Sequence, residues 1–245
     1  MTPEQPSAAI LVIGDEILSG WTQDTNSSFL CKHLTARSIE VRRIVTVPDE
    51  LDEIVTVLTR LISSDYTYIF TSGGLGPTPD DVTRPAVAAA LGVGLLLDQT
   101  AARRYEVLRG EPLNTKQLEM CRLPTGAHPL YGETTGAPGF LVKNIYVLPG
   151  VPQVLQEMWA GIDADFAGQP AYVQTFITHS RESEFAAEME EYQLAYPELK
   201  FGSYPRLKST GWEVTIRVRG SNRELVQQIA ARFMVVIGGE PIDGA

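Results

Sequence analysis

The hydrophobic pattern alternates along the chain between short apolar runs and longer segments with helical spacing. Residues 8–13 are apolar without interruption, which is typical of a strand buried on both faces of a parallel sheet. In residues 51–62, apolar side chains recur every three or four positions behind an acidic first turn, which indicates an amphipathic helix. Similar patterns predict further strands, at 41–47, 66–71 and 144–148, and further helices, at 26–37, 83–91, 99–108, 115–121 and 153–159. This alternation predicts a three-layer, doubly wound α/β domain with a mostly parallel sheet.

The pattern changes after residue 168. The elements that follow are expected in the order strand, helix, strand, strand, helix, at 172–178, 182–192, 200–204, 212–219 and 223–235. Apolar and polar residues alternate from Trp212 onward, so this strand is expected to bury one face and Trp212 with it; Trp159 is likewise expected in a core. We therefore predict two domains, residues 1–168 and 169–245, of which the second is a small α+β unit.

Composition narrows the class of protein. The 245 residues are 44% hydrophobic and 20% charged, which indicates a folded globular protein. With 20 basic and 30 acidic residues the formal net charge is −10, which lowers the expectation of nucleic-acid binding but leaves a nucleotide-sized ligand compatible. Cys31 and Cys121 form no C-x-x-C pair, which suits a reducing compartment. The sequence has no signal-like amino terminus and no apolar stretch near eighteen residues, so we expect a cytoplasmic protein without a membrane segment.

The clearest chemical signal is a glycine-rich segment after the strand at 66–71. Its glycines allow positive φ angles and a close approach of the backbone, so amides here are expected to hold phosphate oxygens. The residues concerned are Ser72, Gly73, Gly74, Leu75 and Gly76. Asp80 and Asp81 supply hard oxygen ligands for a divalent cation, and Thr83 is expected to cap the next helix. A purely structural turn would explain the glycines alone, but the carboxylates that follow favour a ligand site.

Two other loops are expected at the same edge of the sheet. Residues 14–16 follow the first strand and residues 149–152 follow the strand at 144–148, and loops at the carboxyl ends of parallel strands converge on one crevice. Asp15 and Glu16 are expected to complete the metal shell or to orient a water molecule, because carboxylates gathered in one crevice repel each other without a cation. A solvated loop end or a helix cap is the alternative for these two residues.

Five motifs occur along the chain in a fixed order. They are Gly14-Asp15-Glu16-Ile17-Leu18 with Gly20 and Asn26, Gly73-Gly74-Leu75-Gly76-Pro77-Thr78-x-Asp80-Asp81-x-Thr83, Asn114-x-x-Gln117, Gly136-x-Pro138-Gly139 and Pro149-Gly150-x-Pro152. In these motifs the chain resembles the amino-terminal region of the CinA family, a molybdopterin-binding-type domain similar to MogA and MoaB. The resemblance extends to the small unit after residue 170. Full-length CinA proteins continue into a nicotinamide mononucleotide deamidase domain that this sequence does not contain, so deamidase activity is not expected.

The resemblance implies chemistry at an α-phosphorus. In the CinA branch the domain is associated with metal-dependent hydrolysis of nucleotide pyrophosphates, most often ADP-ribose; a related domain occurs in eukaryotic FAD synthase, and in the MogA branch the domain adenylylates molybdopterin. A homo-oligomer is implied, with a divalent cation (magnesium, manganese or cobalt) and optionally a monovalent one. The implied catalytic and metal-binding residues are Asp15, Asp80 and Asp81. The implied substrate-binding residues are Gly14, Glu16, Asn26, Ser72, Gly73, Gly74, Leu75, Gly76, Thr83, Asn114, Gln117, Gly139, Pro149 and Gly150.

Other interpretations stay open at this point. A pterin- or nucleotide-binding module without turnover fits the same motifs. Asn114 and Gln117 are equally compatible with capping a short helix, and Gly139, Pro149 and Gly150 with shaping loops. A Rossmann dehydrogenase is not supported, because no G-x-G-x-x-G follows the first strand. RNA binding in the manner of a KH domain is not expected, because the small unit lacks a G-x-x-G clamp.

Overall fold

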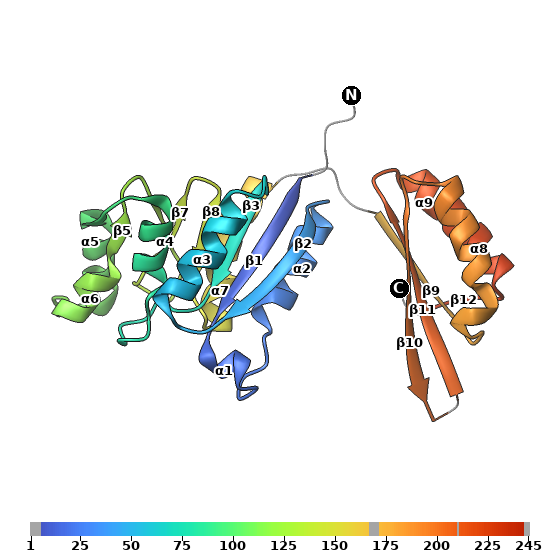
Figure 1. Cartoon of the computed structure of the whole chain (residues 1–245), viewed down its shortest axis with the longest axis horizontal. Coiled ribbons are helices and arrows are strands. Elements are labelled where there is room, and N and C mark those ends of the chain that lie inside the picture. The colour runs from blue at the N-terminus through green and yellow to red at the C-terminus, as the bar shows by residue number, and fades with distance from the viewer. Residues whose placement is uncertain (1–5, 167–171, 210, 243–245) are drawn as a thin grey trace. The chain divides into compact units, whose positions relative to one another are not determined.

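The computed structural model of the chain describes residues 6–166, 172–209 and 211–242. The chain divides into two compact units, a larger one that holds most of residues 1–167 and a smaller one that holds residues 168–245 (Figure 1). The boundary predicted between residues 168 and 169 falls among residues that the structure does not describe. None of the described helices is long and apolar enough to cross a membrane.

The larger unit is built on a six-stranded sheet in the order β2-β1-β3-β8-β7-β6. Four neighbouring strands run parallel: β2 (Glu40–Val47), β1 (Ser7–Ile13), β3 (Tyr68–Ser72) and β8 (Ile145–Leu148). The fifth strand, β7 (Gly139–Val142), is antiparallel to both of its neighbours, β8 and β6 (His128–Leu130). The predicted doubly wound, mostly parallel sheet is confirmed, and the chain reverses its winding direction at β1, between β2 and β3.

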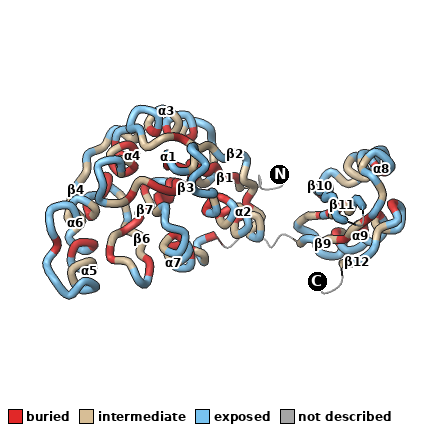
Figure 2. Tube along the Cα trace, turned by 90° about the horizontal axis from the view of Figure 1, so that it is seen from below, coloured by how far each residue is buried: buried red, intermediate tan, exposed pale blue. Residues whose placement is uncertain are grey.

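Helices cover both faces of this sheet (Figure 1). On one face, α3 (Leu51–Ile62) and α4 (Thr83–Leu91) pack against one set of alternate side chains of β1, such as Leu11. On the other face, α2 (Asn26–Ala36) and α7 (Pro152–Ile162) pack against the remaining ones, such as Ile10. Both residues are fully buried, which is why β1 is apolar at every position from Ala8 to Ile13. Figure 2 shows the buried positions gathered along these central strands.

An aromatic cluster fills the core beneath α7. Trp159 is 2% exposed and stacks on Phe166 with the ring centroids 5.1 Å apart, and Phe70 stacks on Tyr146 at the same distance. The expectation that Trp159 lies in a core is therefore confirmed.

Several short elements of the larger unit were not predicted. They are α1 (Asp15–Leu18), β4 (Leu95–Leu97), β5 (Arg122–Pro124), β6, β7 and the 3₁₀ helix η1 (Asp163–Phe166). The predicted helices in this region are present as α5 (Gln99–Arg109) and α6 (Thr115–Met120).

The smaller unit has four antiparallel strands and two helices, in the order β9 (Tyr172–Thr178), α8 (Glu182–Ala195), β10 (Lys200–Lys208), β11 (Gly211–Gly220), α9 (Arg223–Val236) and β12 (Glu240–Pro241). The strand order is β10-β11-β9-β12, and α8 and α9 lie on the same face (Figure 1). The prediction that Trp212 is buried is wrong, because its side chain is 45% exposed. Trp212 pairs with Leu207 in a part of the β10–β11 ribbon that β9 does not reach, since β9 pairs with β11 only from Val214 onward.

Candidate functional site

A cavity of about 470 Å³ lies in the larger unit, where the parallel strands β1, β3 and β8 end. It is lined by the glycine-rich loop after β3, by Pro149 and Gly150 after β8, and by Gly139 at the start of β7. Small-molecule sites usually occupy roughly 300–1,000 Å³, and in doubly wound sheets they form at the carboxyl ends of the strands where the winding direction changes. The cavity therefore has the size and the place of a ligand site.

The glycine-rich loop turns sharply beneath the cavity. Gly73 has φ +113° and Gly74 has φ +62°, angles that residues with a side chain rarely adopt. A Cβ atom on Gly73 would lie 2.0 Å from the carbonyl oxygen of Ile13, and one on Gly74 would lie 2.3 Å from the hydroxyl oxygen of Thr83. Glycine is therefore required at both positions by the backbone path and by the closeness of β1 and α4.

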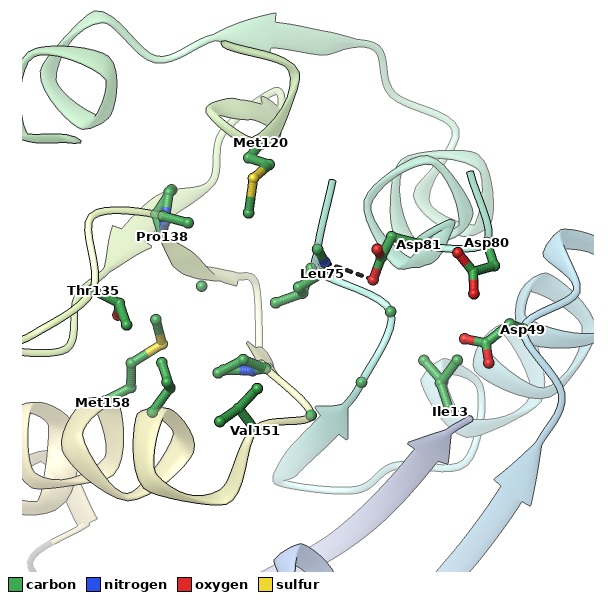
Figure 3. A pocket seen from close by; sticks show the side chains of 18 of the residues that line it. Ile13, Asp49, Leu75, Asp80, Asp81, Met120, Thr135, Pro138, Val151 and Met158 are labelled. Carbon is green, nitrogen blue, oxygen red and sulfur yellow. Dashed lines mark hydrogen bonds between the residues drawn. The ribbon is translucent and has the colours of Figure 1, made fainter. Parts of the chain in front are cut away.

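Asp81 holds the far side of this loop in place. Its carboxylate accepts a hydrogen bond from the amide of Gly76 at 2.6 Å (Figure 3). It also accepts from the amide of Thr78 at 2.9 Å and from the Thr78 hydroxyl. The amide of Gly73 donates to the carbonyl of Leu148 at 3.2 Å. The expectation that all the loop amides face phosphate is therefore wrong for Gly73 and Gly76, whose amides are already bonded within the protein.

Two residues of α4 attach the loop to the helix. Thr83 was expected to be the helix cap, but it is the first helical residue; its hydroxyl donates to the carbonyl of Gly73 at 2.9 Å. Arg84, which the sequence did not single out, is 5% exposed and donates to the carbonyl of Leu75 at 2.6 Å. Burial lowers the pKa of Arg84 to about 10, so the side chain stays positively charged at neutral pH beneath the loop.

A hydrogen-bond network joins the start of α2, the end of β3 and the loop after β8. The side-chain amide of Asn26 donates to the Ser72 hydroxyl at 2.8 Å and to the carbonyl of Gly150 at 2.7 Å, and the Ser72 hydroxyl lies 3.3 Å from the carbonyl of Pro149. Asn26 and Ser72 were expected to bind substrate. They lie behind the cavity wall and fix the loops after β3 and β8 relative to α2.

Three further carboxylates reach the cavity from separate elements: Glu16 from α1, Asp49 from the residues after β2, and Asp80 from the glycine-rich loop. Burial raises the pKa of Asp49, and the negative charges of Glu16, Asp15 and Asp80 add to this effect. Asp15 itself does not line the cavity, but its backbone amide donates to the Asp49 carboxylate at 2.9 Å. Sequence reasoning missed Asp49, although its place just after a parallel strand was a usable signal.

No lysine, arginine or histidine is among the residues that line the cavity. Within the described ranges, no three histidine, cysteine or acidic side chains are close enough to hold a metal ion by themselves. Magnesium usually binds through one or two carboxylates together with substrate phosphates, and the carboxylates of Asp49 and Asp80 are ligands of this kind. The donor set therefore fits a divalent cation that arrives with a phosphate ligand rather than one held in a cage of side chains.

The elevated pKa of Asp49 predicts a pH-dependent stability effect. Between the pKa of Asp49 in the unfolded chain and its higher pKa in the folded protein, only the folded protein holds the proton. The free energy of unfolding therefore falls as pH rises through this range. Asp49→Asn keeps an oxygen for the amide of Asp15 and removes the charge. We expect the variant to melt at a higher temperature than wild type at pH 7.5, and the difference to shrink toward pH 4. Thermal melts without metal at both pH values test this, and a difference that does not change with pH would contradict it.

The opposite side of the cavity is apolar. On one side of the glycine-rich loop the cavity is lined by Met120, Pro138, Val151 and Met158 (Figure 3). On the other side of this loop lie Asp49, Asp80 and Asp81. The cavity thus has a carboxylate half and an apolar half.

Besides Asn26, Ser72 and Thr83, three more residues predicted to bind substrate lie outside the cavity. Asn114 and Gln117 form a reciprocal capping box at the start of α6, with bonds of 3.0 and 2.9 Å between side chain and backbone. Gly14 is buried, and its amide donates to the carbonyl of Val47 at 3.1 Å. Of the two interpretations of Asn114 and Gln117, the structure therefore shows the helix cap.

The two units match two different family models. Residues 9–165 match the family model described as a probable molybdopterin binding domain, and residues 170–242 match the middle domain of FAD synthase. The structure is similar to that of a CinA protein of unknown function from Thermoplasma acidophilum, with a TM-score of 0.61 and 32% sequence identity over 65% of this chain and 97% of that one.

Two relatives match this chain over different shares of its length. A protein from Thermococcus kodakarensis, TK1472, is 41% identical over 62% of this chain and 66% of its own length. A probable FAD synthase from Caenorhabditis elegans is 28% identical over 97% of this chain and 51% of its own length. The chain thus spans between half and two thirds of the length of these curated relatives.

Proposed function

Because the chain belongs to the family of probable molybdopterin binding domains and resembles its CinA-type members, we propose that its cavity binds a nucleotide pyrophosphate and hydrolyses it with a divalent cation. ADP-ribose is the first candidate substrate. The observation that carries the proposal is the division of one cavity into a carboxylate half and an apolar half on the two sides of the glycine-rich loop.

The two halves suit the two parts of such a ligand. A flat heterocycle favours the apolar wall formed by Met120, Pro138 and Met158, and a pyrophosphate favours the loop. Without a basic side chain in the lining, phosphate oxygens are repelled by the carboxylates unless a cation lies between them. The free loop amides are those of Gly74 and Leu75, for which no acceptor lies among the residues that the structure describes.

In the proposed reaction, a water molecule attacks the α-phosphorus of ADP-ribose and the bond from that phosphorus to the bridging oxygen breaks, which gives AMP and ribose 5-phosphate. A bound divalent cation supplies charge neutralisation on the phosphate oxygens. Asp49 and Asp80 are the residues proposed to hold it, with Glu16 close enough to the same cavity to orient the water. Glu16, which is not one of the proposed cation ligands, would accept the proton of the water and pass it to solvent. Asp81 and Arg84 keep the loop in shape during these steps.

Metal removal is expected to abolish turnover. With magnesium, manganese or cobalt supplied in turn, AMP released from ADP-ribose is measured by chromatography, and excess EDTA is expected to lower the rate by about 100-fold or more. AMP release that persists in EDTA would contradict the role of the cation. Absence of AMP with every metal would contradict ADP-ribose as substrate, and FAD, suggested by the match of residues 170–242, is the next substrate to test.

A second function rests on the apolar half of the same cavity, which has room for a pterin ring. If a pterin phosphate attacks the α-phosphorus of ATP in place of water, the bond from that phosphorus to the bridging oxygen breaks, pyrophosphate leaves and the outcome is adenylyl transfer. If nothing attacks, the unit is a binding module. Tight nucleotide or pterin binding without AMP release would favour this second function. We further propose that the protein works in the cytoplasm as a homo-oligomer, which sedimentation analysis would test.

A further inference from the structure

Among the described residues of the small unit, both helices cover one face of the sheet and no helix covers the other. Val214, Ile216 and Val218 on β11 are buried under the helices. Successive side chains of a strand point to opposite faces, so the alternate residues, Arg217 and Arg219 among them, point away from the helices. We call this second surface the open face. By strand pairing it also carries Lys200, Tyr204, Arg206 and Lys208 of β10.

The open face is basic although the protein is acidic. Its cationic side chains are Lys200, Arg206, Lys208, Arg217 and Arg219, and its acidic ones, within the described strands, are Glu213 and Glu240. Glu213 pairs with Lys208 at 2.6 Å. The acidic residues of this unit are concentrated instead on α8, at Glu182, Glu184, Glu188, Glu190 and Glu191. The two sides of this small unit therefore carry charges of opposite sign.

Tyr204 lies in the middle of this basic surface. The ring is 50% exposed and lies against Gly202, where a Cβ atom would be 2.9 Å from the tyrosine hydroxyl. The guanidinium of Arg217 is 5.3 Å from the ring centroid. Glycine at 202 thus lets an aromatic ring lie along the sheet beside a guanidinium group, and both groups have flat surfaces on which a base can stack.

We propose that the open face binds single-stranded RNA, independently of the nucleotide cavity in the larger unit. The cationic residues of β10 extend from Lys200 to Lys208, a distance of roughly 26 Å at the usual rise of a strand, so a single small anion cannot contact them all whereas a phosphate backbone can. Stacking of bases on aromatic residues of a four-stranded sheet is a recurring mode of RNA recognition. The net charge of −10 does not oppose this locally, because charges farther away than about 8–10 Å are largely screened at physiological salt.

A second copy of the chain fits the open face less well. Its complementary surface would be the acidic α8 of the neighbour, and a contact between two different surfaces repeats without closing unless the rotation forms a ring. RNA requires no such closure.

The first test measures fluorescence anisotropy of a labelled twelve-residue oligouridylate with the full chain in 50 mM KCl and at higher salt. We expect Arg206→Ala/Arg217→Ala to bind about tenfold more weakly and to lower the slope of log K against log salt by about 1.4, since each lost phosphate contact on a single strand contributes about 0.7. The matched control is Arg223→Ala/Arg232→Ala, which removes the same charge from exposed positions of α9 and should bind like wild type. Circular dichroism checks that each variant is folded.

The second test separates stacking from charge. Tyr204→Ala is expected to weaken binding about tenfold, whereas Tyr204→Phe, which keeps the ring, should bind like wild type. The proposal is overturned if wild type does not bind the oligomer at low salt, if the α9 control loses as much affinity as the open-face variant, or if Tyr204→Ala binds like wild type. A wild-type dimer that Arg206→Ala/Arg217→Ala dissociates, without RNA binding, would assign the open face to a second copy instead.

Discussion

Gly73→Ala is expected to lower the free energy of unfolding by about 2–4 kcal/mol, the range typical of steric strain at a position with positive φ and no room for a Cβ atom. Gly73 has φ +113°, and the new Cβ atom would lie 2.0 Å from the carbonyl oxygen of Ile13. That oxygen belongs to β1 in the middle of the sheet, so it cannot move away without disturbing the strands on both sides. Urea denaturation followed by circular dichroism measures the change.

Gly92→Ala is the matched control for this prediction. Gly92 also has a positive φ, +67°, but a Cβ atom there would meet nothing within 4 Å. Only the backbone cost of about 1 kcal/mol is expected at this position. Equal destabilisation by the two variants would show that the close approach of the loop to β1 is not what requires glycine at position 73.

Replacement of both Asp49 and Asp80 with asparagine is expected to lower metal-dependent AMP release by about 100-fold or more. The two side chains face the same cavity and are the proposed cation ligands, and neutral amides bind a hard divalent cation poorly. Rates at saturating metal and substrate, measured together with thermal stability, test this. The control is Asp65→Asn, which removes a charge from an exposed residue outside the cavity, at a positive φ that asparagine tolerates.

Asp81→Asn is expected to behave differently from these variants. Its carboxylate accepts three hydrogen bonds from the loop, and an amide has one oxygen fewer with which to accept them. Stability and turnover should therefore fall together. If the Asp49→Asn/Asp80→Asn protein loses stability in the same way and regains activity when refolded at lower temperature, its loss would be structural and the ligand role of these two residues would be wrong.

The central elements of the fold could be predicted because their signals are local. The unbroken apolar run of β1 and the periodic α3 each reflect burial that follows directly from the period of the element. Short strands such as β6 and β7 have no such signal, because three or four residues become a strand only through pairing with β8 and with each other. The burial of Trp212 was predicted wrongly for a related reason, because alternation shows which face a residue shares and not how far the neighbouring strand β9 extends along β11.

The site was predictable in its place and not in its details. Loops at the carboxyl ends of parallel strands had to converge, and the loops around Gly74 and Gly150 do line one cavity. The role of Asp81 could not be read from sequence, because a carboxylate that binds loop amides and one that binds a metal are the same residue type. Asp49 lies in no motif, and its importance depends on the approach of Glu16 and Asp80 in space.

The net charge of the protein also does not reveal the basic open face. A formal net charge of −10 describes the field at long range, whereas a ligand at contact distance meets only the nearest side chains. The register of β10 and β11 places Arg206 and Arg217 on the same face of the sheet, which a count of charged residues along the chain does not reveal.

Manganese binding in the presence of a nucleotide pyrophosphate shows whether Asp49, Asp80 and the phosphates share one cation. Electron paramagnetic resonance of free Mn²⁺ is followed during titration of the full chain, with and without the α,β-methylene analogue of ADP, which cannot be hydrolysed at that bond. We expect the analogue to tighten manganese binding by about tenfold or more in wild type and to have no such effect in Asp49→Asn/Asp80→Asn. Manganese binding that is the same with and without the analogue, or the same in the two proteins, would contradict a cation shared between these carboxylates and the phosphates.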